Sequence, residues 1–224
     1  KNQIQGLVLT HGHEDHIGAI DKLLNIAPID VYGPPLAIKL VHARLEGQPK
    51  KQARLHEIRF GETKSLGRFD VEWVQVTHSI PDSAALFIQT SNGKIVHTGD
   101  FKLDPHPIDG IRTNTSRLKS IGDSGVDLLL SDSTNSERAG CAESETNVGL
   151  ALEKEIRAAP NRILVSCFSS HFHRIQNIAN AAAHSNRKII VLGRALQKAW
   201  ALGVQENYLD VPPDILVPTK YYET

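Results

Sequence analysis

The segment THGHEDHIGA, residues 10–19, decides how the rest of the sequence is interpreted. It follows an apolar run over residues 6–9 that is typical of a short buried strand, and it leads into helical spacing over residues 16–27. Six residues of this segment contain His11, His13, Asp15 and His16. Because imidazole nitrogens and carboxylate oxygens are common ligands of zinc and similar cations, the segment predicts a metal site at the end of a strand.

The spacing of these four side chains also bears on how many ions they hold. A polar surface loop with chance histidines is the alternative, but the pattern HxHxDH directly after a strand argues against it. One short turn cannot wrap all four side chains around a single ion, although it can supply two neighbouring ions. Two such cations can hold a hydroxide between them, as the hydrolysis of phosphoesters requires.

Two further candidate ligands occupy equivalent places after predicted strands. His78 follows the strand predicted over residues 69–77, and Asp100 follows the strand predicted over residues 95–98. Functional side chains of α/β proteins gather where strands end and loops begin. We therefore expect His78 and Asp100 to join the same site.

The pattern of apolar residues predicts an α/β protein with two domains, at residues 1–140 and 141–224. The first half is rich in strands, whereas the second alternates between helix and strand, which predicts a parallel sheet with right-handed crossovers. In the first half we predict strands at 4–10, 31–33, 55–60, 69–77, 84–90, 95–98 and 126–130, with helices at 16–27 and 36–45. In the second half we predict helices at 146–159, 170–184 and 195–206, with strands at 163–168 and 188–192.

Composition limits the classes of function. The 25 Lys and Arg residues balance the 25 Asp and Glu residues, so any nucleic-acid site must be a local groove. Two cysteines without CxxC spacing argue against a disulfide framework and favour the cytoplasm. No apolar run reaches the length of a membrane span. The chain has no Met and enters a strand almost at once, so we expect it to be an internal piece of a longer protein.

Longer motifs in the chain resemble one known family. THGHEDHIGA (10–19), VTHSIPDS (76–83), HTGDFKLD (97–104), LSDSTNSERAG (130–140) and SCFSSHFHRIQ (166–176) are similar to segments of the ribonuclease J family, the β-CASP nucleases of the metallo-β-lactamase superfamily. The resemblance covers essentially the whole chain. It implies a metallo-β-lactamase αββα sandwich with an inserted β-CASP domain of alternating βα units, both incomplete here. Further motifs of the family would precede Lys1 and follow Thr224, and this piece taken alone is expected to have little or no activity.

The resemblance also implies roles for the candidate ligands. One metal ion would be bound by His11, His13 and His78, and the other by Asp15 and His16, with Asp100 bridging the two. Asp15 is also the nearest candidate to accept the proton of the attacking water.

Four other residues have predicted roles. Asp132 matches the acidic residue of the first β-CASP motif and is a second catalytic candidate, the alternative being an Asx-turn. Ser170, His173 and Arg174 lie near the start of a predicted helix, where an RNA phosphate could bind. Ordinary polar residues on a helix surface are the alternative for these three.

The implied function is a metal-dependent ribonuclease that cuts phosphodiester bonds through a hydroxide between two metals. It would act as a 5′-to-3′ exonuclease and endonuclease in RNA maturation and decay. We expect Zn²⁺, with Mn²⁺ as the alternative, because the candidate ligands are N and O donors. Expected partners are single-stranded RNAs with a 5′-monophosphate and further copies of the chain in a homodimer or homotetramer. A DNA nuclease, a small-molecule metallo-hydrolase and a metal-free scaffold subunit are the alternatives.

Overall fold

The computed structural model describes residues 4–47 and 53–222, which form two compact units. The first unit contains residues 4–103 and 112–141, and the second contains residues 104–111 and 142–222. We propose that these units correspond to the two domains predicted from the sequence. The segment 104–111 is the exception, because it packs with the second unit although it lies within the range predicted for the first domain.

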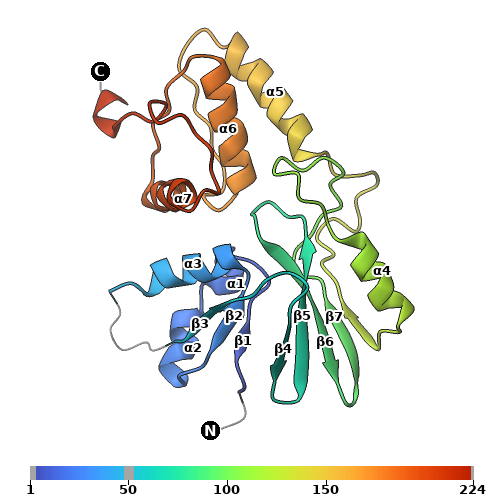
Figure 1. Cartoon of the computed structure of the whole chain (residues 1–224). Helices are drawn as coiled ribbons and strands as arrows, with labels where there is room; N and C mark the ends of the chain where they lie inside the picture. Colours follow the sequence, from blue (N-terminus) through green and yellow to red (C-terminus); the bar gives the residue numbers. More distant parts are fainter. Residues whose placement is uncertain (1–3, 48–52, 223–224) are drawn as a thin grey trace. The chain divides into compact units, whose positions relative to one another are not determined.

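Two sheets form the centre of the first unit (Figure 1). The smaller sheet is parallel and has the order β1-β2-β3. The larger sheet has the order β4-β5-β6-β7-β8, in which neighbouring strands are antiparallel except for the parallel pair β7 and β8. The strands are β1 (Leu7–Val8), β2 (Val31–Gly33), β3 (Leu55–Glu57), β4 (Thr63–Leu66), β5 (Phe69–Val76), β6 (Ser83–Thr90), β7 (Gly93–His97) and β8 (Leu128–Leu130).

Helices cover the outer face of each sheet. Around the smaller sheet lie α1 (Glu14–Ile17), α2 (Ile20–Ile26) and α3 (Pro35–Leu45), and α4 (Thr115–Asp123) covers the larger sheet. Three separate apolar clusters hold these layers together. Val31 packs with the first three helices, Trp73 packs between the sheets, and Val74 packs with Ile121 of α4. Alternate residues of β5 thus face opposite layers, and the predicted αββα sandwich is confirmed.

Two elements of the first unit were not predicted from the sequence. The strand β4 has the sequence TKSL, of which only Leu66 is buried, so it lacks a clear apolar alternation. The helix α4 has the sequence TSRLKSIGD, and its apolar contact with the sheet is made by Leu118 and Ile121, beside an ion pair between Arg117 and Glu72 of β5. The helix predicted at 16–27 is divided into α1 and α2, which are separated at Gly18 and Ala19.

The second unit has the predicted helices but lacks the predicted sheet. Its elements are α5 (Glu145–Ala158), α6 (Phe172–His184), α7 (Arg194–Gln205) and the short 3-10 helix η1 (Thr219–Tyr222). Within the described residues, 163–168 form no strand, and 188–192 make one parallel bridge, between Ile189 and Leu216. The prediction of two strands was therefore wrong in this structure. An apolar run predicts an extended segment. A β-strand also requires a neighbouring strand whose backbone forms hydrogen bonds with its N–H and C=O groups.

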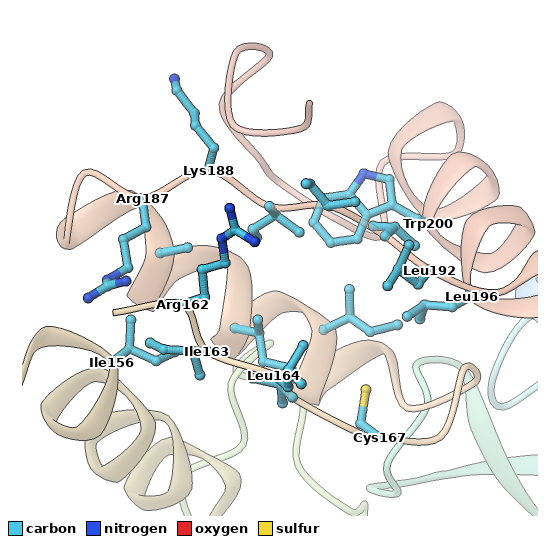
Figure 2. Close-up of a pocket in the computed structure, with 17 residues that line it drawn as sticks. Ile156, Arg162, Ile163, Leu164, Cys167, Arg187, Lys188, Leu192, Leu196 and Trp200 are labelled. Atoms are coloured by element: carbon cyan, nitrogen blue, oxygen red, sulfur yellow. The ribbon is translucent and has the colours of Figure 1, made fainter. Parts of the chain in front are cut away.

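The extended segments of the second unit border an apolar pocket of about 380 Å³ (Figure 2). Aliphatic side chains and Trp200 line most of it, together with the basic residues Arg162, Arg187 and Lys188. Two of these cations have partners already, since Arg187 donates to the Asn161 carbonyl and Lys188 lies 2.6 Å from the Asp214 carboxylate. None of the predicted catalytic or metal-binding residues lines this pocket.

The segment 104–111 is tied to the second unit by polar contacts, of which the one between Asp104 and Glu145 is buried. The Asp104 carboxylate accepts hydrogen bonds from the backbone N–H groups of His106 (2.9 Å) and Glu145 (3.0 Å). The His106 carbonyl accepts hydrogen bonds from the hydroxyls of Ser144 and Thr146, each at 2.6 Å. Because Ser144 also caps α5, the segment is fixed to the start of that helix. No helix within the described part of the chain has the length and apolar character needed to cross a membrane.

Candidate metal centre

The predicted ligands leave the two sheets at neighbouring strand ends. The strands β5 and β7 run in the same direction, since each is antiparallel to β6, and β8 is parallel to β7. The loops that carry His78, Asp100 and Asp132 therefore leave the larger sheet at one edge. The loop after β1 joins them there, because the Thr10 carbonyl accepts a hydrogen bond from the N–H of Ala84 at the start of β6 (2.9 Å).

Three imidazoles and one carboxylate form a first cluster at this edge. The Nδ1 atom of His13 lies 3.1 Å from the Nε2 atoms of both His11 and His78. The Asp100 Oδ2 atom lies 3.9 Å from Nε2 of His11 and 3.8 Å from Nε2 of His78. Nitrogens bound to one tetrahedral zinc ion are about 3.3 Å apart, given ordinary Zn–N bond lengths. The spacing of these four ligand atoms thus fits a single cation.

A second cluster shares the Asp100 carboxylate. The Nε2 atom of His16 lies 3.4 Å from Oδ2 of Asp100 and 3.5 Å from Oδ2 of Asp15. The side chain of Asp15 is 77% exposed, so this cluster is more open than the first. The structure brings together all six residues predicted as ligands, and Asp100 Oδ2 belongs to both groups.

Burial keeps the most enclosed histidine neutral. His11 is fully buried, and this burial, with the positive charges that His16, His13 and His78 can carry, lowers its pKa from 6.5 to about 2. A neutral imidazole has a lone pair on one nitrogen, which a cation can accept. His11 is therefore ready to bind a metal ion at neutral pH without first losing a proton.

Neighbouring polar groups hold the ligands on their outer sides. The Thr10 hydroxyl lies 3.0 Å from Nδ1 of His11, and the Ser79 hydroxyl lies 3.3 Å from Nε2 of His13. The ring of His97 accepts a hydrogen bond from the N–H of Gly99, one residue before Asp100 (3.0 Å). No periodic signal in the sequence pointed to the contacts of Thr10 or Ser79.

The helix α3 supports two of the metal-binding loops. Gly12 lies so close to this helix that a Cβ atom there would be 2.5 Å from Cδ1 of Leu40. Ile80, in the loop after β5, is 1% exposed. It also packs near Gly12, because its Cδ1 atom would lie 3.5 Å from a Cβ atom at Gly12. The Asp82 carboxylate accepts a hydrogen bond from the N–H of Leu36 in the first turn of α3 (3.1 Å). One helix thus fixes the loop of His11 and His13 and the loop of His78.

Asp132 contacts the loop of Asp100. Its carboxylate accepts hydrogen bonds from the N–H and hydroxyl of Thr134 (2.9 and 2.7 Å) and from the N–H of Phe101 (3.4 Å). Burial raises the pKa of Asp132, but these hydrogen bonds and nearby His78 outweigh it, so the pKa lies below its ordinary value. Asp132 is therefore an ionised acceptor that links the ends of β7 and β8. Its catalytic role stays a prediction.

The three residues predicted to contact RNA phosphate lie at the start of α6, and two of them have protein partners. His173 is 4% exposed, and its Nε2 atom lies 3.1 Å from the Asp109 carboxylate. Arg174 donates two hydrogen bonds to the buried carboxylate of Glu145 (2.6 and 3.2 Å). Ser170 lies in the turn before the helix, where its carbonyl accepts from the N–H of Phe172 (3.0 Å). A phosphate at Arg174 would have to compete with Glu145.

The capping of α6 also reduces its capacity to bind an anion. The ring of His171 is the N-cap and accepts a hydrogen bond from the N–H of Arg174 (3.1 Å). One of the backbone donors that an anion would use is therefore satisfied by the protein. The contact of Ser170, His173 and Arg174 with RNA stays a prediction.

Comparison with known proteins agrees with these features. The family described as "Metallo-beta-lactamase superfamily" matches residues 1–139, and the one described as "Ribonuclease J, beta-CASP domain" matches residues 160–224. Proteins named Ribonuclease J from Helicobacter pylori and Thermus thermophilus are each 40% identical to the chain, over 95% and 94% of its length. The Ribonuclease J of Mycobacterium tuberculosis is 40% identical over 100% of the chain. The chain spans 31%, 38% and 40% of these three relatives.

A solved structure supports the fold. A protein of unknown function from Enterococcus faecalis superposes with a TM-score of 0.63 at 18% identity, covering 96% of this chain and 55% of that one. The family match over residues 1–139 covers more than half of the 224 residues. The chain therefore belongs to the metallo-β-lactamase superfamily, and its residues 160–224 match the model of the ribonuclease J β-CASP domain.

Proposed function

We propose that the protein is a metal-dependent ribonuclease that hydrolyses phosphodiester bonds of RNA. The observation that carries the proposal is the convergence of six N and O ligand atoms into two groups that share the Asp100 carboxylate. The ribonuclease name of the 40% identical relatives supports RNA as the substrate.

The ligand set fits two divalent cations. His11, His13 and His78 would hold the first, Asp15 and His16 the second, and Asp100 both. When bound, two such cations lower the pKa of a water molecule and neutralise charge on phosphoryl oxygens. Imidazole and carboxylate ligands suit Zn²⁺, which we propose as the natural ion, with Mn²⁺ as the alternative.

The residues of the chain would orient the reactants and move the proton. The exposed carboxylate of Asp15 would accept the proton of the attacking water as the oxygen adds to phosphorus. The bond between phosphorus and the 3′-oxygen then breaks, and the 3′-oxygen takes a proton from solvent, which leaves a 5′-phosphate on one product and a 3′-hydroxyl on the other. Asp132 would keep the Asp100 turn in place during this step through its contact with Phe101.

We further propose a setting for this activity. The substrate would be single-stranded RNA, preferentially with a 5′-monophosphate, cut in 5′-to-3′ exonuclease and endonuclease modes during RNA maturation and decay. The full-length protein would act as a homodimer or homotetramer in the cytoplasm. Cys141 and Cys167 are both free thiols, which supports a reducing compartment.

The direct test is cleavage of labelled substrates by the full-length polypeptide that contains this sequence. We expect 5′-monophosphorylated RNA to be degraded with Zn²⁺ or Mn²⁺, and His78→Ala and Asp100→Ala to lose activity by at least about 10³-fold, because both remove metal ligands. Glu14→Gln is a matched control, since Glu14 lies in the same motif but pairs with Arg44 (2.8 Å) and lies outside both ligand groups. Cleavage of DNA alone, or full activity in both ligand variants, would refute the proposal.

A further inference from the structure

A single hydroxyl group joins two loops of the first unit. Thr113 is 8% exposed, and its hydroxyl accepts a hydrogen bond from the N–H of Thr77 (2.9 Å) and donates one to the Lys102 carbonyl (3.1 Å). Thr77 directly precedes His78, and Lys102 comes two positions after Asp100. The Thr113 hydroxyl therefore donates to one of these loops and accepts from the other.

Backbone hydrogen bonds complete this junction. The N–H of Lys102 donates to the Thr77 carbonyl (2.8 Å), and the N–H of Asn114 donates to the carbonyl of Gln75 in β5 (3.0 Å). The chain is thus attached beside the end of β5 both before and after residues 104–111, which belong to the second unit. We call residues 104–111 the strap, because the chain leaves the first unit and rejoins it at this one junction.

The strap is held in the second unit at the starts of two helices. At α5, the His106 carbonyl accepts hydrogen bonds from the hydroxyls of Ser144 and Thr146, each at 2.6 Å. At α6, the Asp109 carboxylate lies 3.1 Å from Nε2 of His173, which is 4% exposed. A displacement of either helix start therefore acts on the strap directly.

We propose that the strap couples the second unit to the metal centre, and that Thr113 is the positioning residue on which this coupling depends. One link consists of the strap contacts at α5 and α6, and the other is the junction beside His78 and Asp100. Energetic coupling between distant groups is carried by such continuous networks of hydrogen bonds and packed side chains. The inference rests on the proposed function, because the two loops at the junction carry ligands of the proposed metal centre.

Substitutions in the two units test the two links separately. Ser144→Ala removes one donor to the His106 carbonyl together with the side-chain cap of α5. Thr113→Val removes the hydroxyl of the junction and keeps the shape of the side chain, whereas Thr113→Ser keeps the hydroxyl. Asp214→Ala is the matched control in the second unit, since Asp214 is 77% exposed and pairs with Lys188.

Hydrogen exchange of the metal-free, full-length polypeptide, followed by mass spectrometry, measures how firmly the junction is closed. The informative amides are those of Thr77 and Lys102, because both donate hydrogen bonds within it. We expect Ser144→Ala to speed their exchange by about 10-fold, as expected when a junction is weakened by roughly one hydrogen bond. Asp214→Ala should leave their exchange unchanged.

The double variant shows whether Thr113 carries the effect. Thr113→Val should speed the exchange of both amides by itself, and the addition of Ser144→Ala should change it no further, because the link is already broken. In the Thr113→Ser background, Ser144→Ala should act as it does in the wild type. A Thr113 that merely stabilised the fold would give independent, additive effects.

Coupling must also act in the opposite direction, because linkage is reciprocal. The N–H of Glu145 at the start of α5 donates to the strap residue Asp104 (3.0 Å). Saturation with Zn²⁺ should slow the exchange of this amide by about 10-fold in the wild type and in Thr113→Ser. The same addition of Zn²⁺ should have no effect on it in Thr113→Val.

Unchanged exchange at Thr77 and Lys102 in Ser144→Ala would overturn the proposal, as would additive effects of Ser144→Ala and Thr113→Val. Zn²⁺ that binds without slowing the exchange of the Glu145 amide would also overturn it. Should Thr113→Val not fold, Thr146→Val removes the other donor to His106, and unchanged exchange at the junction in both second-unit variants refutes the coupling. A protein that binds no Zn²⁺ would contradict the proposed function, whereas the metal-free measurements would still decide whether the strap acts on the two loops.

Discussion

The carboxylate of Asp82 accepts a hydrogen bond from the backbone N–H of Leu36, 46 positions earlier in the chain, at 3.1 Å. The N-cap residue of α3 is Pro34, which has no side-chain acceptor, so Asp82 supplies the cap from another loop. Asp82 also has a positive φ of 56°, a conformation that aspartate and asparagine tolerate better than most residues. The loop of His78 is thereby attached to the helix that packs against Gly12.

Removal of this cap should loosen the first unit. We expect Asp82→Ala to lower the free energy of unfolding by about 0.5–2 kcal/mol for the lost cap, with a further cost from the positive φ. Asp82→Asn keeps an acceptor and the backbone conformation, and should stay close to the wild type. Urea unfolding measures both variants, and an alanine variant as stable as the wild type would show that the contact has no structural role.

Gly99 is the glycine whose replacement should most affect the Asp100 turn. A Cβ atom there would lie 2.7 Å from the Ala84 carbonyl oxygen, and φ is +58°. We expect Gly99→Ala to lower the free energy of unfolding by more than about 2 kcal/mol. It should also weaken Zn²⁺ binding, because the backbone directly before Asp100, the ligand shared by both groups, must move.

Gly110 provides the matched control for that substitution. Its φ is +72°, and a Cβ atom there would meet nothing within 4 Å among the described residues. Gly110→Ala should therefore lower the free energy of unfolding by about 1 kcal/mol, through backbone strain alone, and leave Zn²⁺ affinity unchanged. Equal effects of the two substitutions on Zn²⁺ binding would argue against a role for close packing at Gly99.

The buried His11 should make the metal-free protein sensitive to acid. Its pKa is about 2 in the folded protein against 6.5 for an unperturbed histidine, so between these values the unfolded chain binds a proton that the folded chain does not. Neutral His11 therefore makes its full contribution to the free energy of unfolding above pH 6.5. As the pH falls below 6.5, this contribution decreases by at most about 1.4 kcal/mol per pH unit.

His11→Asn removes this titrating group. In urea unfolding of the metal-free proteins between pH 8 and pH 5, the unfolding free energy of the wild type should decrease more steeply below pH 6.5 than that of the variant. Parallel profiles would mean that His11 is protonated in the folded state or is not buried as described.

Arg174 allows the predicted RNA contact to be separated from a structural role. Its side chain is 30% exposed, and its guanidinium pairs with Glu145, whose side chain is 5% exposed. Arg174→Met would leave the Glu145 carboxylate buried without this partner, and we expect a loss of stability on the order of 3 kcal/mol. The double variant Glu145→Gln with Arg174→Met should recover much of it, because the buried charge is also removed.

RNA affinity decides between the two roles of Arg174. If Arg174 binds phosphate, the double variant should be stable and still bind 5′-monophosphorylated RNA more weakly than the wild type. If Arg174 serves only the ion pair, the double variant should bind RNA normally. Filter binding at two salt concentrations distinguishes the outcomes, since a lost phosphate contact also reduces the salt dependence.

The six ligand positions could be predicted because each follows an apolar strand pattern and has a side chain suited to metals. The strands of the second unit were wrongly predicted, because Ile163 and Val165 form an apolar run but lack ladder partners in the described residues. The contacts of Thr10, Ser79 and Asp82 could not be foreseen. A hydroxyl or carboxylate in a loop gives no periodic signal, and Ser79 meets its partner His13 at a separation of 66 positions.

Metal stoichiometry tests the central claim most directly. The full-length polypeptide, dialysed against buffer with excess Zn²⁺ and then freed of unbound metal, should contain two ions per chain by elemental analysis. Asp100→Ala should lose most of both, since Asp100 Oδ2 belongs to both ligand groups, whereas Glu14→Gln should retain both. A folded wild-type protein that binds no divalent cation, or an Asp100→Ala variant that still binds two, would contradict the account.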